Sequence, residues 1–191
     1  MESEQYVSPV LAVASLAVVF IALFIMILVE LPFAERLRVF IDEHTQKLML
    51  AVALGATASS LYYSEVVGFI PCEFCWFQRI MMYPLALLLL VSVVSRSRID
   101  SRYIVALAAV GLPLSIYHYQ LQRFPDQGKI CSGVISCTDR NVDQFGFVSI
   151  PFMAGCGFLA ILLLQLAEWR VAYWYRRWYG GDADDGSSSV A

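Results

Sequence analysis

Five long stretches without a charged side chain constrain the fold of this chain more than any other feature of its sequence. They cover residues 5–29, 48–64, 80–95, 103–117 and 144–167. A helix that crosses the hydrocarbon core of a membrane needs about 20 predominantly apolar residues. The first and last stretches meet this length, and the three shorter ones reach it with polar or basic side chains that extend toward the headgroups. One such stretch can lie in the core of a soluble helical bundle, but five are too many.

The composition of the chain agrees with a membrane protein. Of its 191 residues, 59% are hydrophobic and 15% are charged, whereas soluble domains average ~45–50% apolar and ~25% charged residues. Backbone groups exposed to lipid must find hydrogen-bond partners within the protein, so only helices and closed barrels span a bilayer. Uninterrupted apolar stretches of this length favour helices. We therefore predict an all-α, polytopic membrane protein with five spans, and we expect no nucleic-acid partner.

The chain divides into three predicted parts. Residues 1–44 hold the first span, which we interpret as a retained helix because the N-terminus is acidic and the apolar stretch is longer than that of a signal peptide. After this span, apolar residues from Phe33 to Ile41 recur at helical spacing, which suits a short helix in the membrane interface. Residues 45–179 hold the other four spans and their loops. Residues 180–191 are rich in Gly, Asp and Ser, so we expect a disordered acidic tail.

The distribution of Lys and Arg sets the expected orientation, because basic residues collect on the cytoplasmic side of membrane proteins. Nine of the 13 basic residues fall on one side of the predicted spans, namely Arg36, Arg38, Lys47, Arg96, Arg98, Arg102, Arg170, Arg176 and Arg177. The other side has Arg79, Arg123, Lys129 and Arg140. The N-terminus then lies outside together with four of the five cysteines, which are Cys72, Cys75, Cys131 and Cys137. Disulfide bonds form and persist on that side of the membrane.

Cys72 and Cys75 form a C-x-x-C motif directly after Pro71, at the start of the third span. Proline favours the first turn of a helix, and the free N–H groups at a helix N-terminus stabilise a thiolate. The two cysteines share a helix face, which Arg79 continues four residues after Cys75. A guanidinium near a thiolate lowers the pKa of the thiol, and it can hold a carbonyl oxygen of a ring that accepts electrons.

Other interpretations of these residues stay open on sequence grounds. A C-x-x-C motif also occurs as a structural disulfide, or as half of a zinc site that here would need Cys131 and Cys137 as further thiolate ligands. Arg79 can equally be an interfacial arginine that reaches the headgroups. His118, at the outer end of the fourth span, is either a hydrogen-bonded interface residue or a proton donor for a reaction that consumes protons.

The second cysteine pair lies in the longest external segment, roughly residues 119–147, whose Pro, Asp and Gly content indicates a mobile loop. Only five residues separate Cys131 from Cys137. A disulfide that closes so small a ring adds little to stability, because the entropic benefit grows with ring size. An exposed, labile disulfide is open to attack by an incoming thiolate, which forms a mixed disulfide. We therefore interpret this pair as an exchanging disulfide.

Two regions of the sequence resemble the disulfide-bond formation protein B (DsbB) family, especially its BdbC-like branch. The first is Pro71-Cys72-x-x-Cys75-Trp76-Phe77-Gln78-Arg79, followed by Met82-Tyr83-Pro84. The second combines Tyr117-His118-Tyr119-Gln120, the pair Cys131 and Cys137, and residues 145–152. The similarity covers about residues 48–168. In proteins similar to vitamin K epoxide reductase the membrane C-x-x-C follows the loop cysteines, so the order found here favours the DsbB-like interpretation.

The resemblance implies a role for each of the four outer cysteines. Cys131 would form the mixed disulfide with a thioredoxin-like thiol oxidase similar to DsbA, and Cys137 would resolve it. Cys72 would exchange with this loop pair. Cys75 would face a quinone and pass the electrons on.

The resemblance also implies a quinone, either ubiquinone or menaquinone, near Arg79 and His118, and no bound metal. The family fold is a four-helix membrane bundle, so the span over residues 5–29 would be an extra N-terminal helix. The expected protein is a membrane thiol:quinone oxidoreductase that reoxidises its partner and supports disulfide bond formation. It would lie in the prokaryotic plasma membrane with its active face outside the cytoplasm. The alternative is a non-catalytic membrane protein, such as a small transporter or scaffold, with structural disulfides.

Overall fold

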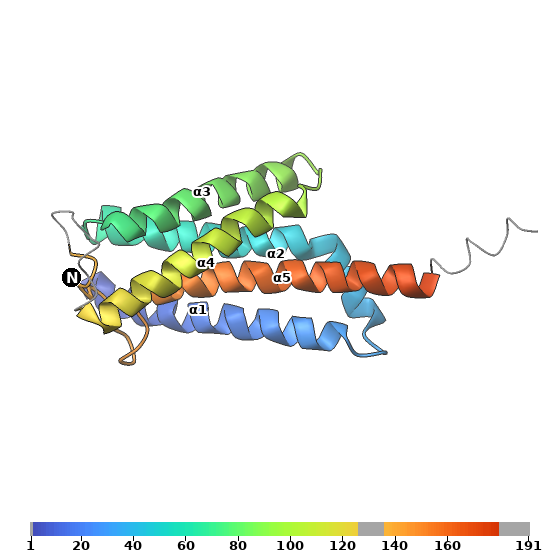
Figure 1. The fold of residues 1–191 in the computed structure, drawn as a ribbon, viewed down its shortest axis with the longest axis horizontal. Coiled ribbons are helices and arrows are strands. Elements are labelled where there is room, and N and C mark those ends of the chain that lie inside the picture. Colours follow the sequence, from blue (N-terminus) through green and yellow to red (C-terminus); the bar gives the residue numbers. More distant parts are fainter. Residues whose placement is uncertain (1, 126–135, 180–191) are drawn as a thin grey trace, which may run out of the picture.

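The computed structural model describes residues 2–125 and 136–179, in which five α-helices run back and forth along one long axis (Figure 1). These helices are α1 (Glu2–Val29), α2 (Glu35–Leu61), α3 (Glu73–Val94), α4 (Ser101–Arg123) and α5 (Ile150–Tyr179). A π-helical turn, η1 (Tyr62–Val66), continues α2. The described residues form no strand, and their one isolated β-bridge joins Gln144 and Val148. The prediction of an all-α fold is confirmed.

Four of the helices are long and apolar enough to cross a membrane. They contribute the segments Tyr6–Val29, Glu73–Val94, Ser101–Arg123 and Ile150–Trp178. The fifth helix, α2, is less apolar because charged residues occupy its first half, but it runs along the same axis as the others (Figure 1). The structure is therefore a polytopic helical bundle, as predicted, with α1 as the additional N-terminal helix.

The N-terminal half of α2 differs from the prediction. We expected a separate interfacial helix over residues 33–41, but the chain forms one continuous helix from Glu35 to Leu61. No proline or glycine interrupts residues 35–54, so the helix has no local reason to break. The buried Arg38 also ties the start of α2 to its neighbours, because it donates hydrogen bonds to the carbonyl oxygens of Val29 (3.1 Å) and Leu31 (2.6 Å). Val29 is the last residue of α1, where carbonyl groups have no partner within the helix.

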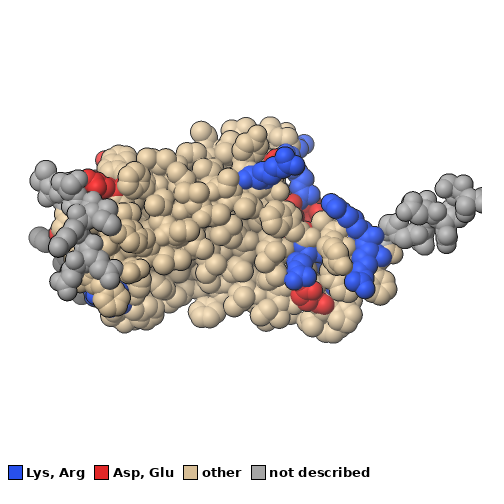
Figure 2. All heavy atoms as spheres, viewed as in Figure 1, with Lys and Arg blue, Asp and Glu red and all other residues tan. Residues whose placement is uncertain are grey.

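The charged residues lie toward the two ends of the bundle and leave an uncharged band between them in the view of Figure 2. Most of the Lys and Arg visible there lie at the end where α1, α3 and α5 finish. At this end Arg98 joins two helices, because it pairs with Asp42 of α2 and with Glu168 of α5. This segregation along the helix axes follows the basic-residue asymmetry seen in the sequence.

Gly111 of α4 allows close contact between α4 and α5. A Cβ atom at this position would lie 2.3 Å from ring atoms of Phe158, a fully buried side chain of α5. Small residues at such crossings let membrane helices approach each other. Gly55 of α2 differs from it, since a Cβ atom there would meet no atom within 4 Å.

We expect Gly111→Ala to destabilise the bundle by about 1–3 kcal/mol, because the new methyl group would overlap the ring of Phe158 and force it to move. Thermal unfolding of the purified protein in detergent measures the effect. Gly55→Ala is the matched control and should leave the unfolding temperature unchanged or raise it, since alanine favours a helix over glycine. Equal unfolding temperatures for Gly111→Ala and the wild type would contradict this account of the α4–α5 contact.

Candidate active site

The C-x-x-C motif lies where α3 begins. Cys72 is the N-cap residue, with an extended backbone (φ −73°, ψ 173°), and its carbonyl oxygen accepts a hydrogen bond from the N–H group of Trp76 at 3.1 Å. The helix starts at Glu73, so Pro71 precedes the cap and does not occupy the first turn as we expected. The predicted placement of the motif at a helix N-terminus is otherwise confirmed.

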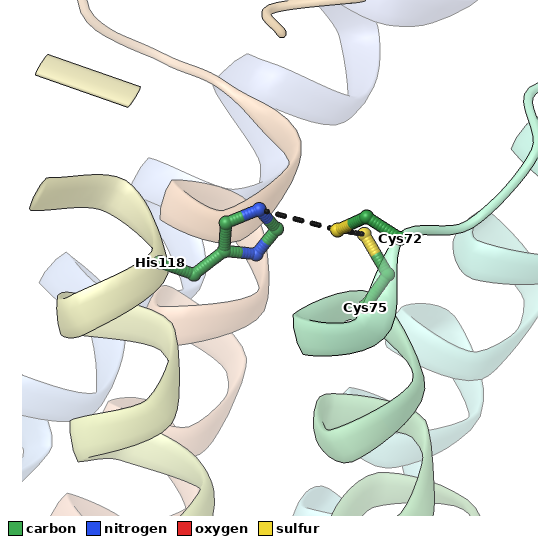
Figure 3. A group of neighbouring side chains, drawn as sticks. All are labelled: Cys72, Cys75 and His118. Atoms are coloured by element: carbon green, nitrogen blue, oxygen red, sulfur yellow. Dashed lines mark hydrogen bonds between the residues drawn. The ribbon is translucent and has the colours of Figure 1, made fainter. Parts of the chain in front are cut away.

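The two cysteines and His118 form a compact group (Figure 3). The Sγ atoms of Cys72 and Cys75 are 3.3 Å apart, and both residues are free thiols in this structure. His118 approaches from α4 and places its Nε2 atom 3.5 Å from Sγ of Cys72. Its ring is only 2% exposed. A dithiol in hydrogen-bond contact with an imidazole can exchange protons as well as electrons.

Cys72 is the thiol that these contacts activate. The hydrogen bond with Cys75 and the interactions with His118 lower the pKa of Cys72 to about 4, although burial acts in the opposite direction. At neutral pH the side chain is therefore a thiolate, the form that attacks a disulfide.

Gln78 orients His118, a role that sequence reasoning missed. Its side chain is buried, and its Nε2 atom lies 3.5 Å from Nδ1 of His118. An amide NH₂ group is a donor, so Nδ1 is the acceptor and a neutral ring carries its proton on Nε2, which faces Cys72. The spacing of Gln78 three residues after Cys75 was the available signal, because i,i+3 positions share a helix face.

A large cavity of about 550 Å³ borders one side of the dithiol. Cys75 and Arg79 both line this cavity, together with Tyr83 and Ser60. Arg79 donates from Nε to Oγ of Ser60 (2.9 Å) and from a terminal nitrogen to the carbonyl oxygen of Ser60 (3.1 Å), and Tyr83 donates to Oγ of Ser60 (3.1 Å). These contacts hold the cation at the cavity wall on the same side as Cys75. The remainder of the lining is mostly apolar.

A second, smaller cavity of about 250 Å³ also borders the dithiol. Cys72 and His118 line it, and residues of the α4–α5 loop such as Ser136 and Asp139 complete it. Cys75 borders both cavities, whereas Cys72 borders only the smaller one. The two cysteines of the motif are therefore not equivalent in position.

The loop cysteine Cys137 packs close to the motif. It is disulfide-bonded, only 1% exposed, and belongs to the same buried cluster as Cys72, Phe74 and Leu121. Cys131, the other predicted loop cysteine, lies outside the residues that the structure describes. The predicted tail over residues 180–191 lies outside them as well.

Hydrogen bonds hold the described part of the α4–α5 loop in place, whereas its composition indicated a mobile loop. The Nε2 atom of Gln122, near the end of α4, donates to the carbonyl oxygen of Asp139 at 3.0 Å. Arg140 of the loop also contacts Gln122: it donates from Nε (3.0 Å) and from a terminal nitrogen (2.8 Å) to the carbonyl oxygen of Gln122. The sequence patterns did not reveal these long-range contacts. They fix the loop beside the smaller cavity.

The predicted quinone residues occupy different places. Arg79 lines the large cavity, but His118 does not line it and lies beside Cys72 at the smaller one. His118 is thus placed to act on the thiols, and Arg79 to act on a molecule in the large cavity.

The same group can in principle hold a metal ion. The ligand atoms of Cys72, Cys75 and His118 all lie within 4.8 Å of one another, and no other His, Cys, Asp or Glu among the described residues joins them. Structural zinc sites use four protein ligands. The four-thiolate site considered from the sequence is not formed here, because Cys137 is disulfide-bonded.

The fold and the site define a class of protein. Helices apolar enough to cross a membrane hold a reactive dithiol at one end of the bundle, beside a disulfide-bonded loop cysteine. Such an arrangement belongs to a membrane thiol–disulfide oxidoreductase.

Comparison with known proteins makes the assignment specific. The family model described as disulfide bond formation protein DsbB matches residues 43–171, and the chain belongs to this family. It is 42% identical over 127 residues to a probable disulfide formation protein of Oceanobacillus iheyensis, an alignment that covers 65% of this chain and 88% of that protein. It is 40% identical over 116 residues to disulfide bond formation protein C of Bacillus subtilis, covering 60% and 84% respectively. No solved structure matches the chain.

Family membership confirms the predicted resemblance and the prediction of a disulfide oxidoreductase. The non-catalytic alternative is thereby set aside. The matched region begins at residue 43, so α1 lies outside it.

Proposed function

We propose that the protein oxidises the dithiol of a thioredoxin-like thiol oxidase outside the cytoplasm and passes the electrons to a quinone of the plasma membrane. The observation that carries this proposal is that the two cysteines of the dithiol border different cavities. Cys72 lines the smaller one, beside the loop that holds Cys137, and Cys75 also lines the large one, which is largely apolar with a cation in its wall. Electrons entering from the loop would leave through the large cavity.

The entry of electrons is a pair of disulfide exchanges. The partner's thiolate attacks Cys131 and forms the mixed disulfide. The partner's second thiol then resolves it, which leaves the partner oxidised and the loop pair reduced. Resolution by Cys137, the role that the resemblance implied, would return the partner in its reduced form. Cys137 then attacks the Cys72–Cys75 disulfide at Cys72, and Cys131 completes the exchange, so that the loop disulfide is restored and the C-x-x-C motif is reduced. The burial of Cys137 and Cys72 in one cluster supports this step. The low pKa of Cys72 supports the completion of the exchange, because Cys72 is the leaving group when Cys131 attacks Cys137 in the mixed disulfide, and a thiolate with a low pKa leaves readily.

The exit of electrons takes place at Cys75, the cysteine that borders the large cavity. A bound quinone, either ubiquinone or menaquinone, supplies the acceptor for two electrons and two protons. Arg79 binds and orients a carbonyl oxygen with the N–H groups that it does not donate to Ser60, and Tyr83 helps to hold Ser60 in place at the cavity wall. The Cys75 thiol supplies one proton, and the other, which Cys72 gave up on becoming a thiolate, is taken up from water. The Nε2–H group of His118 donates a hydrogen bond to that thiolate. The thiols form a disulfide, so protons and electrons balance.

A reconstituted assay tests the proposal. Purified protein, a reduced thioredoxin-like partner and a soluble quinone analogue should give partner disulfide and quinol in equal amounts, followed by quinone absorbance. Partner oxidation without loss of quinone would point to a different acceptor. Absence of both reactions would contradict the proposed function.

A further inference from the structure

The helix outside the family match, α1, forms one wall of the large cavity. It packs mainly along α5 and makes little contact with α2, and the cavity occupies the space between α1 and α2. Its lining residues recur on one helix face, at Val7, Leu11, Ala14, Ser15 and Val18. At 1.5 Å per residue, the wall from the first to the last of these positions is about 16 Å long. The cavity is therefore an elongated groove.

Polar and apolar groups are separated along this groove. Arg79, Ser60 and Tyr83 gather beside Cys75, whereas the α1 side and the facing part of α2 are predominantly apolar. Gly55 of α2 leaves the groove wide, since no atom lies within 4 Å of the position that its Cβ would take. A molecule that fits such a groove has a polar ring and an attached hydrocarbon chain.

The N-terminal end of α1 is fixed beside the polar part of the groove. The hydroxyl of Tyr63, in η1, donates to Oγ of Ser8 at 3.1 Å, and both side chains are buried. This contact connects α1 to the segment that follows Ser60. The wall is thus attached to the bundle on both sides, through α5 and through η1.

We propose that α1 and α2 hold the isoprenoid tail of the quinone, so that α1 determines how strongly tail-bearing quinones bind. This inference rests on the proposed function, and it adds where the tail of the quinone binds. The continuity of the apolar groove with Cys75 favours a quinone tail over a separate lipid chain, because only a tail must start at the redox site. The shorter family match indicates that this wall is an addition to the common bundle.

Two substitutions that fill the groove from opposite walls test the inference. Ala14→Trp adds an indole from α1, and Gly55→Leu adds a side chain from α2, where leucine also favours the helix. We expect each to raise the KM for a long-tailed quinone by about tenfold or more, with little change for a tailless quinone. Val13→Trp is the matched control, because Val13 is 55% exposed and does not line the groove. It should leave both KM values unchanged.

The measurements separate this inference from the proposed function. Failure of the wild-type protein to reduce either quinone would overturn the proposed function and the tail site with it. If the wild type is active but both groove variants keep the wild-type ratio of the two KM values, the tail does not lie in this groove. An equal rise in both KM values would also overturn the inference, since it would mean that the wall acts only on the ring site. Thiol trapping of the partner exchange, which should be unaffected, shows that the variants are folded.

Discussion

Replacing Cys75 by serine is expected to lower the rate of quinone reduction by about a thousandfold or more, as happens when the reacting group of a catalytic unit is removed. Cys75 is the member of the motif that borders the large cavity, and a serine oxygen cannot form the disulfide that releases two electrons. The loop disulfide does not need Cys75 for its first exchange. We therefore expect one equivalent of partner to be oxidised in a rapid single turnover, after which the reaction stops. Stopped-flow measurement of quinone absorbance and quantitative thiol trapping follow the two events.

Cys156→Ser provides the matched control for this experiment. Cys156 is a buried free cysteine of α5 that does not line either cavity. Its replacement should leave turnover at the wild-type rate. Continued turnover in Cys75→Ser would mean that electrons leave by another route.

Replacing His118 by alanine is expected to raise the pKa of Cys72 toward that of an ordinary thiol. In the wild type the low pKa keeps Cys72 a thiolate above about pH 4, so its alkylation rate should stay high at pH 5 and fall only as the pH drops through about 4. Without the imidazole the thiol protonates at a higher pH, so the alkylation rate at pH 5 should fall by about twofold for a rise of one pKa unit and by about tenfold for a rise of two. Mass spectrometry of the reduced, alkylated protein measures the rate at Cys72.

His44→Ala is the control, because His44 is the other of the two histidines in the chain and lies in α2, away from the motif. Its pH profile should match that of the wild type. If His118→Ala also gave the wild-type profile, the imidazole would not stabilise the thiolate.

Much of the fold could be predicted from local patterns. Uncharged stretches indicated the membrane helices, and the C-x-x-C motif after Pro71 indicated a helix start with two cysteines on one face. The continuity of α2 was not predicted, because the helical spacing of apolar residues from Phe33 to Ile41 was interpreted as a separate interfacial helix. A helix needs a breaker or a cap to end, and neither is present there.

The arrangement around the dithiol could not be read from spacing, because it depends on how separate helices pack. Ser60 and Arg79 are 19 residues apart, and Gln78 and His118 are 40 apart, yet both pairs are in contact. His118 lines the smaller cavity and not the large one, which its place in the sequence does not reveal. The contribution of α1 to that cavity is likewise a property of tertiary packing, since nothing in residues 5–29 distinguishes a cavity wall from a lipid-facing side.

The most direct test uses a protein in which the C-x-x-C motif is the only outer cysteine pair. In the Cys131→Ser, Cys137→Ser double variant, partner exchange is removed while Cys72 and Cys75 are kept. The reduced variant, mixed anaerobically with a soluble quinone, should consume one equivalent of quinone and form one Cys72–Cys75 disulfide. A dithiol that stays reduced while the quinone persists would contradict the central claim that this motif delivers electrons to a quinone.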